Sequence, residues 1–154
     1  MRKTTTYARK CALRRREQAK VIVIDQINAD VASIKLDANI HCLTGNDAER
    51  LADRAGRICF IAAKASEGIA DKSTIDVDAR ILRGMARALA DIVQFESALE
   101  DFRAAIHSGM EAAERMLTRC DRSAIAAAAV ELEVLLDRDG LWTRHIDQAF
   151  GVAA

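Results

Sequence analysis

The sequence predicts an all-α protein, a single bundle of four or five helices, and three observations lead to that prediction. Apolar residues make up 51% of the chain but aromatic residues only 4%, so a core of closely packed Ala, Leu, Ile and Val is expected. The chain has no proline and seven glycines, whereas a β-sandwich or a βαβ fold of 154 residues needs many tight turns. Its apolar residues recur three and four positions apart, which is the spacing of one helix face.

Positive charge is concentrated near the N-terminus, although the whole chain is neutral. Residues 1–20 contain eight basic side chains and one acid, Glu17, so they carry a net charge of +7 and residues 21–154 carry −7. This asymmetry suggests a charged partner or self-association through opposite poles. We therefore divide the chain into a basic N-terminal helical extension, residues 1–20, and one helical-bundle domain, residues 21–154.

The first helix of the bundle is expected from residue 21 to about Leu43. The β-branched run at residues 21–24 belongs to it and not to a strand, because helical spacing continues beyond the run. The basic extension should continue this helix toward the N-terminus. In an alternative interpretation the helix breaks near Asn28, and Asp30 caps a second segment. The apolar stripe consists of Val21, Ile24, Ile27, Val31, Ile34 and Ala38.

A second helix is expected at about residues 47–67. Asn46 is a suitable N-cap residue, Glu49 completes a capping box, and Gly68 ends the helix. Phe60 falls opposite the apolar stripe, on a side that is otherwise polar. A large aromatic residue at such a position suggests a second contact surface.

The longest apolar pattern predicts one unusually long central helix at about residues 77–119. Such a helix would be about 64 Å long, so it should either kink near Gly109, where the pattern slips by one residue, or protrude from the bundle. Over residues 95–117 the apolar face narrows to a seam suited to one partner helix, in this chain or in a second copy. The predicted interface residues of this seam are Phe95, Leu99, Phe102 and Ile106.

Two further helices complete the predicted bundle. One spans about residues 123–138, and its alanines would allow a neighbouring helix to approach closely. A short last helix is expected near residues 141–150, with Trp142, Ile146 and Phe150 on one side.

Nucleic-acid binding is the leading alternative function, because phosphate contacts require positive charge more than they require a motif. Three basic patches could merge into one surface, namely the N-terminal residues 2–20 and the arginine triples at positions 50, 54 and 57 and at positions 80, 83 and 87. Against this, the chain is neutral, Arg80 and Arg87 can pair with acids one turn away, and residues 48–68 do not form a helix-turn-helix motif. The candidate residues are Arg9, Lys10, Arg14, Arg15, Arg16, Lys20, Arg50, Arg54, Arg57, Arg80, Arg83 and Arg87.

No metal site, cofactor site or catalytic site is predicted. The sequence lacks CxxC, HExxH and ExxH spacings, the nucleophile elbow and the glycine-rich phosphate-binding loops. His41 and Cys42 are adjacent and would point about 100° apart on a helix, so they could not easily share one metal ion. The nearest approach to an acid–base pair is Glu100 with His107, and we interpret these residues as part of a solvated helix face.

The predicted function is therefore binding. No apolar run is long enough to span a membrane, no secretion signal is recognisable, and the four cysteines are far apart, so we expect a cytoplasmic protein with reduced thiols. We expect a non-enzymatic protein-binding module that acts as an adaptor, regulator or inhibitor of another protein, roles that include accessory proteins of mobile elements. Phe60 and the seam are the expected contact sites, and a homodimer through the seam is a further expectation.

Overall fold

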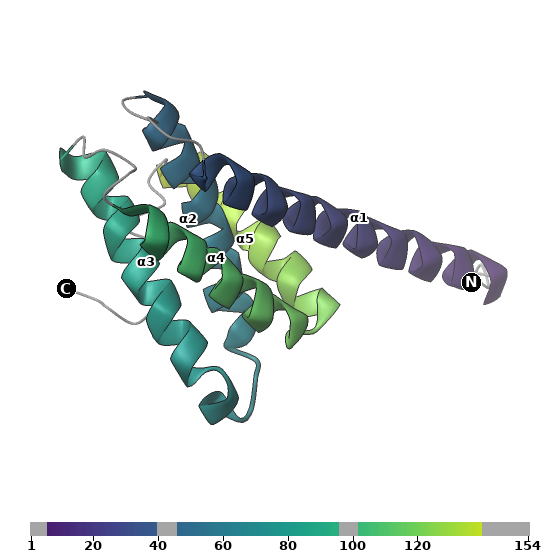
Figure 1. Ribbon diagram of the computed structural model, residues 1–154. Helices are drawn as coiled ribbons and strands as arrows, with labels where there is room; N and C mark the ends of the chain where they lie inside the picture. The colour runs from purple at the N-terminus through teal and green to yellow at the C-terminus, as the bar shows by residue number, and fades with distance from the viewer. Residues whose placement is uncertain (1–5, 40–45, 96–101, 140–154) are drawn as a thin grey trace.

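The computed structural model describes residues 6–39, 46–95 and 102–139, which form an all-α bundle (Figure 1). These ranges contain no strand, so the predicted fold class is confirmed. Among the described helices, none combines the length and the apolar character that crossing a membrane requires. The helices are α1 (Thr6–Ala38), α2 (Asn46–Ser66), α3 (Asp76–Phe95), α4 (Arg103–Thr118) and α5 (Arg122–Asp139), with a 3-10 turn, η1 (Lys72–Thr74), before α3.

The central helix of the bundle is α2, because each of the other four helices packs against it. Its bounds agree with the predicted range of about 47–67. The prediction that Phe60 lies on an exposed polar side is wrong, since its side chain is only 1% exposed. A helix with neighbours on several sides buries more than one stripe, and residues 58–63 are all buried.

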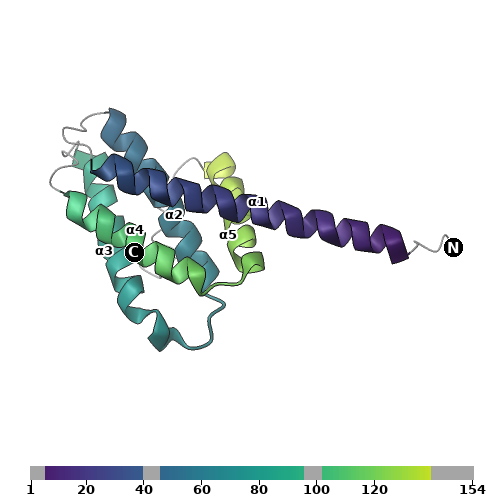
Figure 2. The same ribbon diagram turned by 45° about the vertical axis from the view of Figure 1, so that its right-hand side comes forward.

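The prediction of one long helix over residues 77–119 is wrong. Instead, α3 ends at Phe95, α4 begins at Arg103, and the two helices pack side by side (Figure 2). The apolar pattern continues from one helix to the next because both bury their stripes in the same core, including Met85 of α3 and Ile106 of α4. Gly109 does not mark a kink between two helices, since it lies inside α4.

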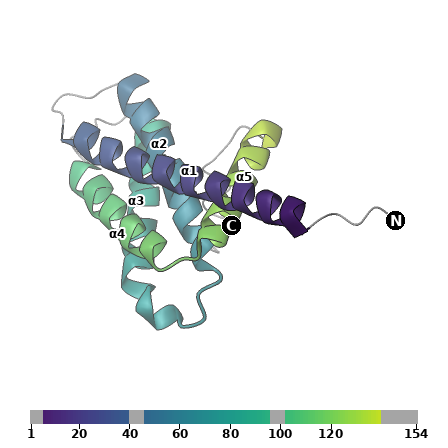
Figure 3. The ribbon, with the colours of Figure 1, turned by 90° about the vertical axis from the view of Figure 1, so that its right-hand side faces the viewer.

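The longest described helix is α1, with 33 residues, or about 50 Å. As expected, the basic extension and the first bundle helix form one helix, and the alternative with a break near Asn28 is wrong. Only the C-terminal half packs in the core, through residues such as Ile27, Val31 and Ile34. The N-terminal half extends beyond the other helices in Figures 1 and 2, whereas in Figure 3 it crosses in front of α5 and only its end extends beyond.

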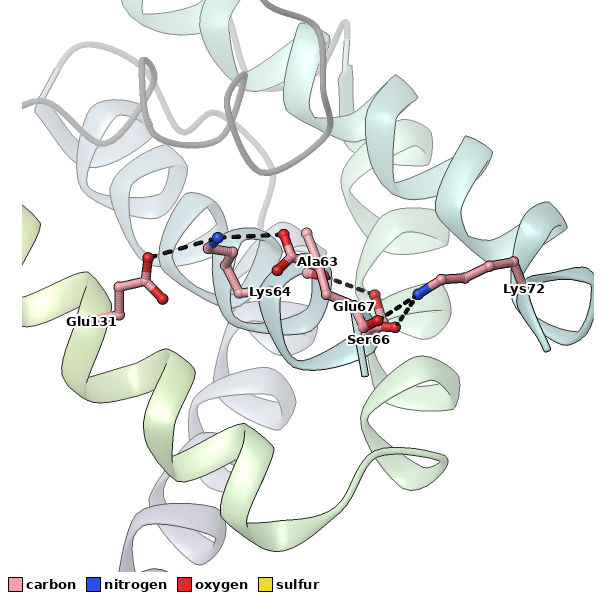
Figure 4. Close-up of polar contacts among 6 residues, drawn as sticks. All are labelled: Ala63, Lys64, Ser66, Glu67, Lys72 and Glu131. Carbon is pink, nitrogen blue, oxygen red and sulfur yellow. Dashed lines mark hydrogen bonds and ion pairs between the residues drawn. The ribbon is translucent and has the colours of Figure 1, made fainter. Parts of the chain in front are cut away.

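Polar contacts fasten the C-terminal end of α2 to its surroundings (Figure 4). Lys64 forms ion pairs with Glu67, at 3.3 Å, and with Glu131 of α5, at 3.6 Å. Lys72 donates hydrogen bonds to the carbonyl oxygens of Ser66, at 2.9 Å, and Glu67, at 2.8 Å. Carbonyl groups at a helix C-terminus have no partner within the helix, so the Lys72 ammonium group satisfies two of them.

The last described helix, α5, agrees with the helix predicted at about residues 123–138. It packs against α1 and α2. The short helix predicted near residues 141–150 lies outside the described residues.

Candidate functional site

A groove with a volume of about 580 Å³ lies between α1 and α5, and α2 forms its floor. Three helices contribute apolar side chains to its lining, which is why no single sequence window identified it. These side chains are Val23 and Ile27 of α1, Ile58 and Ile61 of α2, and Ala126, Ala129, Val130, Leu132 and Val134 of α5.

The groove continues onto the outer face of α5, because this helix is apolar on two opposite sides. Its inner face, which includes Ile125 and Leu132, is buried in the core. On the outer face, Val130 is 64% and Val134 is 59% exposed. A helix that is apolar all round is normally covered on all sides. Apart from Glu131 and Glu133, all residues from 124 to 136 are apolar, which is the signal in the sequence that could have indicated this surface.

Two arginines at the groove use their charge within the protein. Arg54 donates hydrogen bonds to Asp37, at 2.6 Å, and to the hydroxyl group of Ser33, also at 2.6 Å, which joins α2 to α1. Arg57 donates to Glu133 at 3.1 Å and thereby joins α2 to α5. The predicted nucleic-acid ligands Arg54 and Arg57 thus hold the helices around the groove.

The remaining predicted arginines of the bundle lie away from the N-terminal extension. Arg80, Arg83 and Arg87 are exposed on α3, and Arg50 is exposed near the start of α2. The N-terminal half of α1 points away from α3 (Figures 1 and 3). The expected merging of three basic patches into one surface is therefore wrong.

Residues 6–19 of α1, which we call the basic arm, keep their cations in solvent. The arm has five basic residues, and none of them forms an ion pair or a side-chain hydrogen bond with a described residue. They are Arg9, Lys10, Arg14, Arg15 and Arg16. Lys20, at the base of the arm, differs from them. Its ammonium group donates hydrogen bonds to Glu17, at 2.9 Å, and to Ser123 of α5, at 3.0 Å, and so marks the point where α1 reaches the bundle.

Over its described part, the predicted seam is packed inside the protein. Ile106 is 0% exposed, and Phe102 is half-buried against the core. The seam residues of α4 pack within this chain, against α2 and α3, which is one of the two arrangements that the sequence allowed. Leu99 and the side chain of Phe95 lie outside the described residues.

The described residues contain no group of three His, Cys, Asp or Glu side chains that could hold a metal ion. Burial raises the pKa of the Cys59 thiol, so this thiol is neutral at physiological pH. Burial also raises the pKa of Cys120, and the nearby Asp121 carboxylate adds to this effect. His107 lies 3.8 Å from Glu111 of its own helix. Glu100, His41, Cys42 and His145 lie outside the described residues.

Comparison of the chain with known protein families, with curated proteins and with solved structures found no match. The apolar groove and the basic arm are therefore the features of the described residues that point to a function. Both features are suited to binding a macromolecule.

Proposed function

We propose that this chain is a non-enzymatic protein-binding module and that its groove takes an amphipathic helix of a partner protein. The observation that carries this proposal is the outer face of α5, which no described residue covers and where Val130 and Val134 lie exposed beside an apolar groove. Contiguous exposed apolar surface beside a groove is typical of sites where proteins bind one another.

The shape of the groove favours a helix as its occupant. Two helices form its walls and a third forms its floor, so a fourth helix would lie on them as helices do within a bundle. Ala126 and Ala129 are small and would allow close approach of that helix. A small molecule is the weaker candidate, because ligand pockets usually enclose most of the ligand, whereas Val130 and Val134 are largely open to solvent.

The charges at the groove favour an occupant with an apolar stripe. Arg54 and Arg57 already pair with acids of the same protein, so they leave little uncompensated charge for a charged ligand. Further along the lining, Lys20, Asp30 and Asp137 place both signs of charge at the groove. A partner helix with an apolar stripe and mixed charges along its edges would match this arrangement.

The proposed role is that of an adaptor, regulator or inhibitor of another protein, in the cytoplasm, and accessory proteins of mobile elements include such roles. Cys11, Cys59 and Cys120 are free thiols, which supports a reducing compartment. A second copy of the chain is the alternative occupant of the groove. Sedimentation of the purified protein distinguishes the two, since a monomer at high concentration would exclude the homodimer.

The test compares two matched double substitutions in a capture experiment from nuclease-treated lysate. Val130→Asp with Val134→Asp places two charges on the outer face of α5, whereas Val77→Asp with Val93→Asp places them at exposed positions of α3. We expect the α5 pair to abolish capture of a partner and the α3 pair to leave it unchanged. A photo-crosslinking residue at position 134 should link the same partner. Capture that survives the α5 substitutions, or no crosslinked protein, would overturn the proposal.

A further inference from the structure

We infer that the basic arm is a preformed helix that binds B-form DNA by insertion into the major groove. This inference is independent of the protein-binding groove, because the cations of the arm lie at residues 9–16, before the groove-lining Ala19 and Lys20. Five observations support it. They are the unpaired cations, their arrangement around the helix, the loss of the apolar face of α1, the fit of the helix to the major groove of DNA, and the charge of the first turn.

Among the described residues, no acid forms an ion pair with the cations of the arm. Residues 6–19 contain one acidic residue, Glu17, and it pairs with Lys20 at the base of the arm. The arm therefore presents uncompensated positive charge that attracts an anionic partner at long range. Four of its five unpaired cations are arginines, whose guanidinium groups can donate two parallel hydrogen bonds to one phosphate.

The arm presents these cations on every side of the helix. At about 100° per residue, Arg9, Arg14 and Arg15 project in directions between about 100° and 140° apart. A flat acidic surface would contact only one side of such a helix. The major groove has a phosphate backbone along each edge, so cations on opposite sides of an inserted helix can reach phosphates at the same time.

The face that α1 buries in the bundle becomes basic in the arm. Arg9 precedes Ile27 by 18 residues, and Arg16 precedes Ile34 by 18 residues, which corresponds to five helical turns in each case. The counterpart of the buried Val31 is Leu13, so this side of α1 continues into the arm mainly as arginine, with one apolar residue, and it forms no continuous apolar seam for a coiled-coil partner. The arm also lacks the apolar face of a membrane-surface helix, because Tyr7 and Leu13 point about 120° apart.

The dimensions of the arm fit the proposed ligand. An α-helix with side chains is about 10–12 Å wide, and the major groove of B-form DNA is about 12 Å wide. Residues 6–19 would extend along the groove for about 21 Å. They are exposed except for the half-buried Cys11, so the part of the bundle that the structure describes does not block the approach of a duplex.

The position of the cations along α1 is unfavourable without an anion. The first turn of α1 contains no acid, and the basic residues follow at the positive end of the helix dipole. Phosphate groups would reduce the repulsion between these cations and the positive end of the helix, because the backbone amides and the basic side chains at this end both favour negative charge. The arrangement therefore favours an anionic partner over a purely solvated helix.

The experiment measures binding of a fluorescent duplex DNA of about 20 base pairs as a function of salt concentration. If the five unpaired cations contact phosphates, the plot of log K against log salt should have a slope of about −4.5. Arg14→Glu with Arg15→Glu and Arg16→Glu should weaken binding at least tenfold at low salt and reduce the slope by about three units. The same triple change at Arg80, Arg83 and Arg87 has the same net charge and should leave the slope near that of the wild type.

Several outcomes would overturn the inference. They are no duplex binding at low ionic strength, equal weakening by the two triple substitutions, tighter binding of single-stranded DNA, and tighter binding of anionic vesicles or of polyglutamate. Urea unfolding of both triple variants controls for folding, and the arm variant should unfold at the wild-type midpoint because the arm lies outside the core. Because partner capture is done after nuclease treatment, failure of one proposal does not decide the other.

Discussion

Gly109 of α4 lies against the side chain of Met85 of α3, so closely that a Cβ atom at position 109 would overlap the Met85 side chain. Met85 is 0% exposed, so its side chain has little free space into which it could move. The missing side chain at position 109 therefore determines how closely α3 and α4 pack. This contact explains the glycine, which lies inside a helix where alanine would otherwise be favoured.

Replacing Gly109 with alanine should destabilise the protein by about 1–3 kcal/mol, because the added methyl group overpacks the contact with Met85. Urea unfolding measures this change. Gly84 of α3 provides the matched control, since a Cβ atom there would meet nothing within 4 Å. Gly84→Ala should stabilise the protein by about 0.5–1 kcal/mol through helix propensity alone. Equal effects of the two substitutions would contradict the close packing of α3 and α4.

The same pair of helices shows why sequence periodicity predicted the bundle but not its connections. Met85 and Ile92 in α3 share one spacing pattern with Ile106 in α4, because both helices bury one stripe in the same core. No glycine or proline interrupts residues 85–108, so the sequence gives no local signal for the end of α3. By contrast, α2 begins at Asn46 and ends two residues before Gly68, so the bounds predicted from these two residues agree with the structure.

Phe60 shows a second limit of periodicity, since the expectation of one buried stripe placed this residue in solvent. Because α2 is surrounded by four helices, its buried surface extends around the helix and includes Phe60. The position of a helix in the bundle depends on long-range packing, which one helical window does not contain. The basic arm, in contrast, was predictable because local charge defines it, whereas the groove required residues of three helices.

Phe60→Ala should lower the free energy of unfolding by about 3–5 kcal/mol, as expected for loss of a buried aromatic side chain. Chemical unfolding of the purified protein measures this change. The control is Val134→Ala, because Val134 is 59% exposed. It should change stability by less than about 0.5 kcal/mol. A small effect of Phe60→Ala would instead indicate that Phe60 faces solvent and is available as a contact site.

Asp78 and Arg115 form an ion pair that joins α3 to α4. The Nε atom of Arg115 donates a hydrogen bond to Oδ1 of Asp78, at 2.9 Å, and the Nη2 atom lies 2.8 Å from the same oxygen in an ion pair; the hydrogen bond raises the pKa of Arg115. The side chain of Asp78 is 10% exposed and that of Arg115 is 49% exposed. Solvent therefore screens the pair only in part.

A double-mutant cycle with Asp78→Asn and Arg115→Gln should give a coupling energy of about 1 kcal/mol, since the hydrogen bonds are charge-assisted but Arg115 is half exposed. The pair of Arg57 and Glu133 is the control, because both side chains are more than one-third exposed. Its coupling energy should be no more than about 0.5 kcal/mol. Similar coupling in the two cycles would show that burial of Asp78 does not strengthen its pair.

Cys59 should make the stability of the protein depend on alkaline pH. Its thiol is fully buried and donates a weak hydrogen bond to the carbonyl oxygen of Leu82, at 3.8 Å, and burial raises its pKa in the folded state. In the unfolded state the thiol ionises near pH 8.5. Above that pH the unfolded state binds fewer protons than the folded state, so the free energy of unfolding should fall as pH rises.

Above pH 8.5 this one thiol should lower the free energy of unfolding by up to about 1.4 kcal/mol per pH unit, and below that pH it should add nothing to the pH dependence. Urea unfolding of the wild type and of Cys59→Ala between pH 7 and pH 10 isolates the contribution as a difference between two slopes. Ile58→Val is the control, because it perturbs the same part of α2 without changing an ionisable group, and it should shift the curve while keeping the wild-type slope. Parallel curves for the wild type and Cys59→Ala would show that the thiol ionises as readily in the folded protein as in the unfolded chain, which is incompatible with its burial in the core.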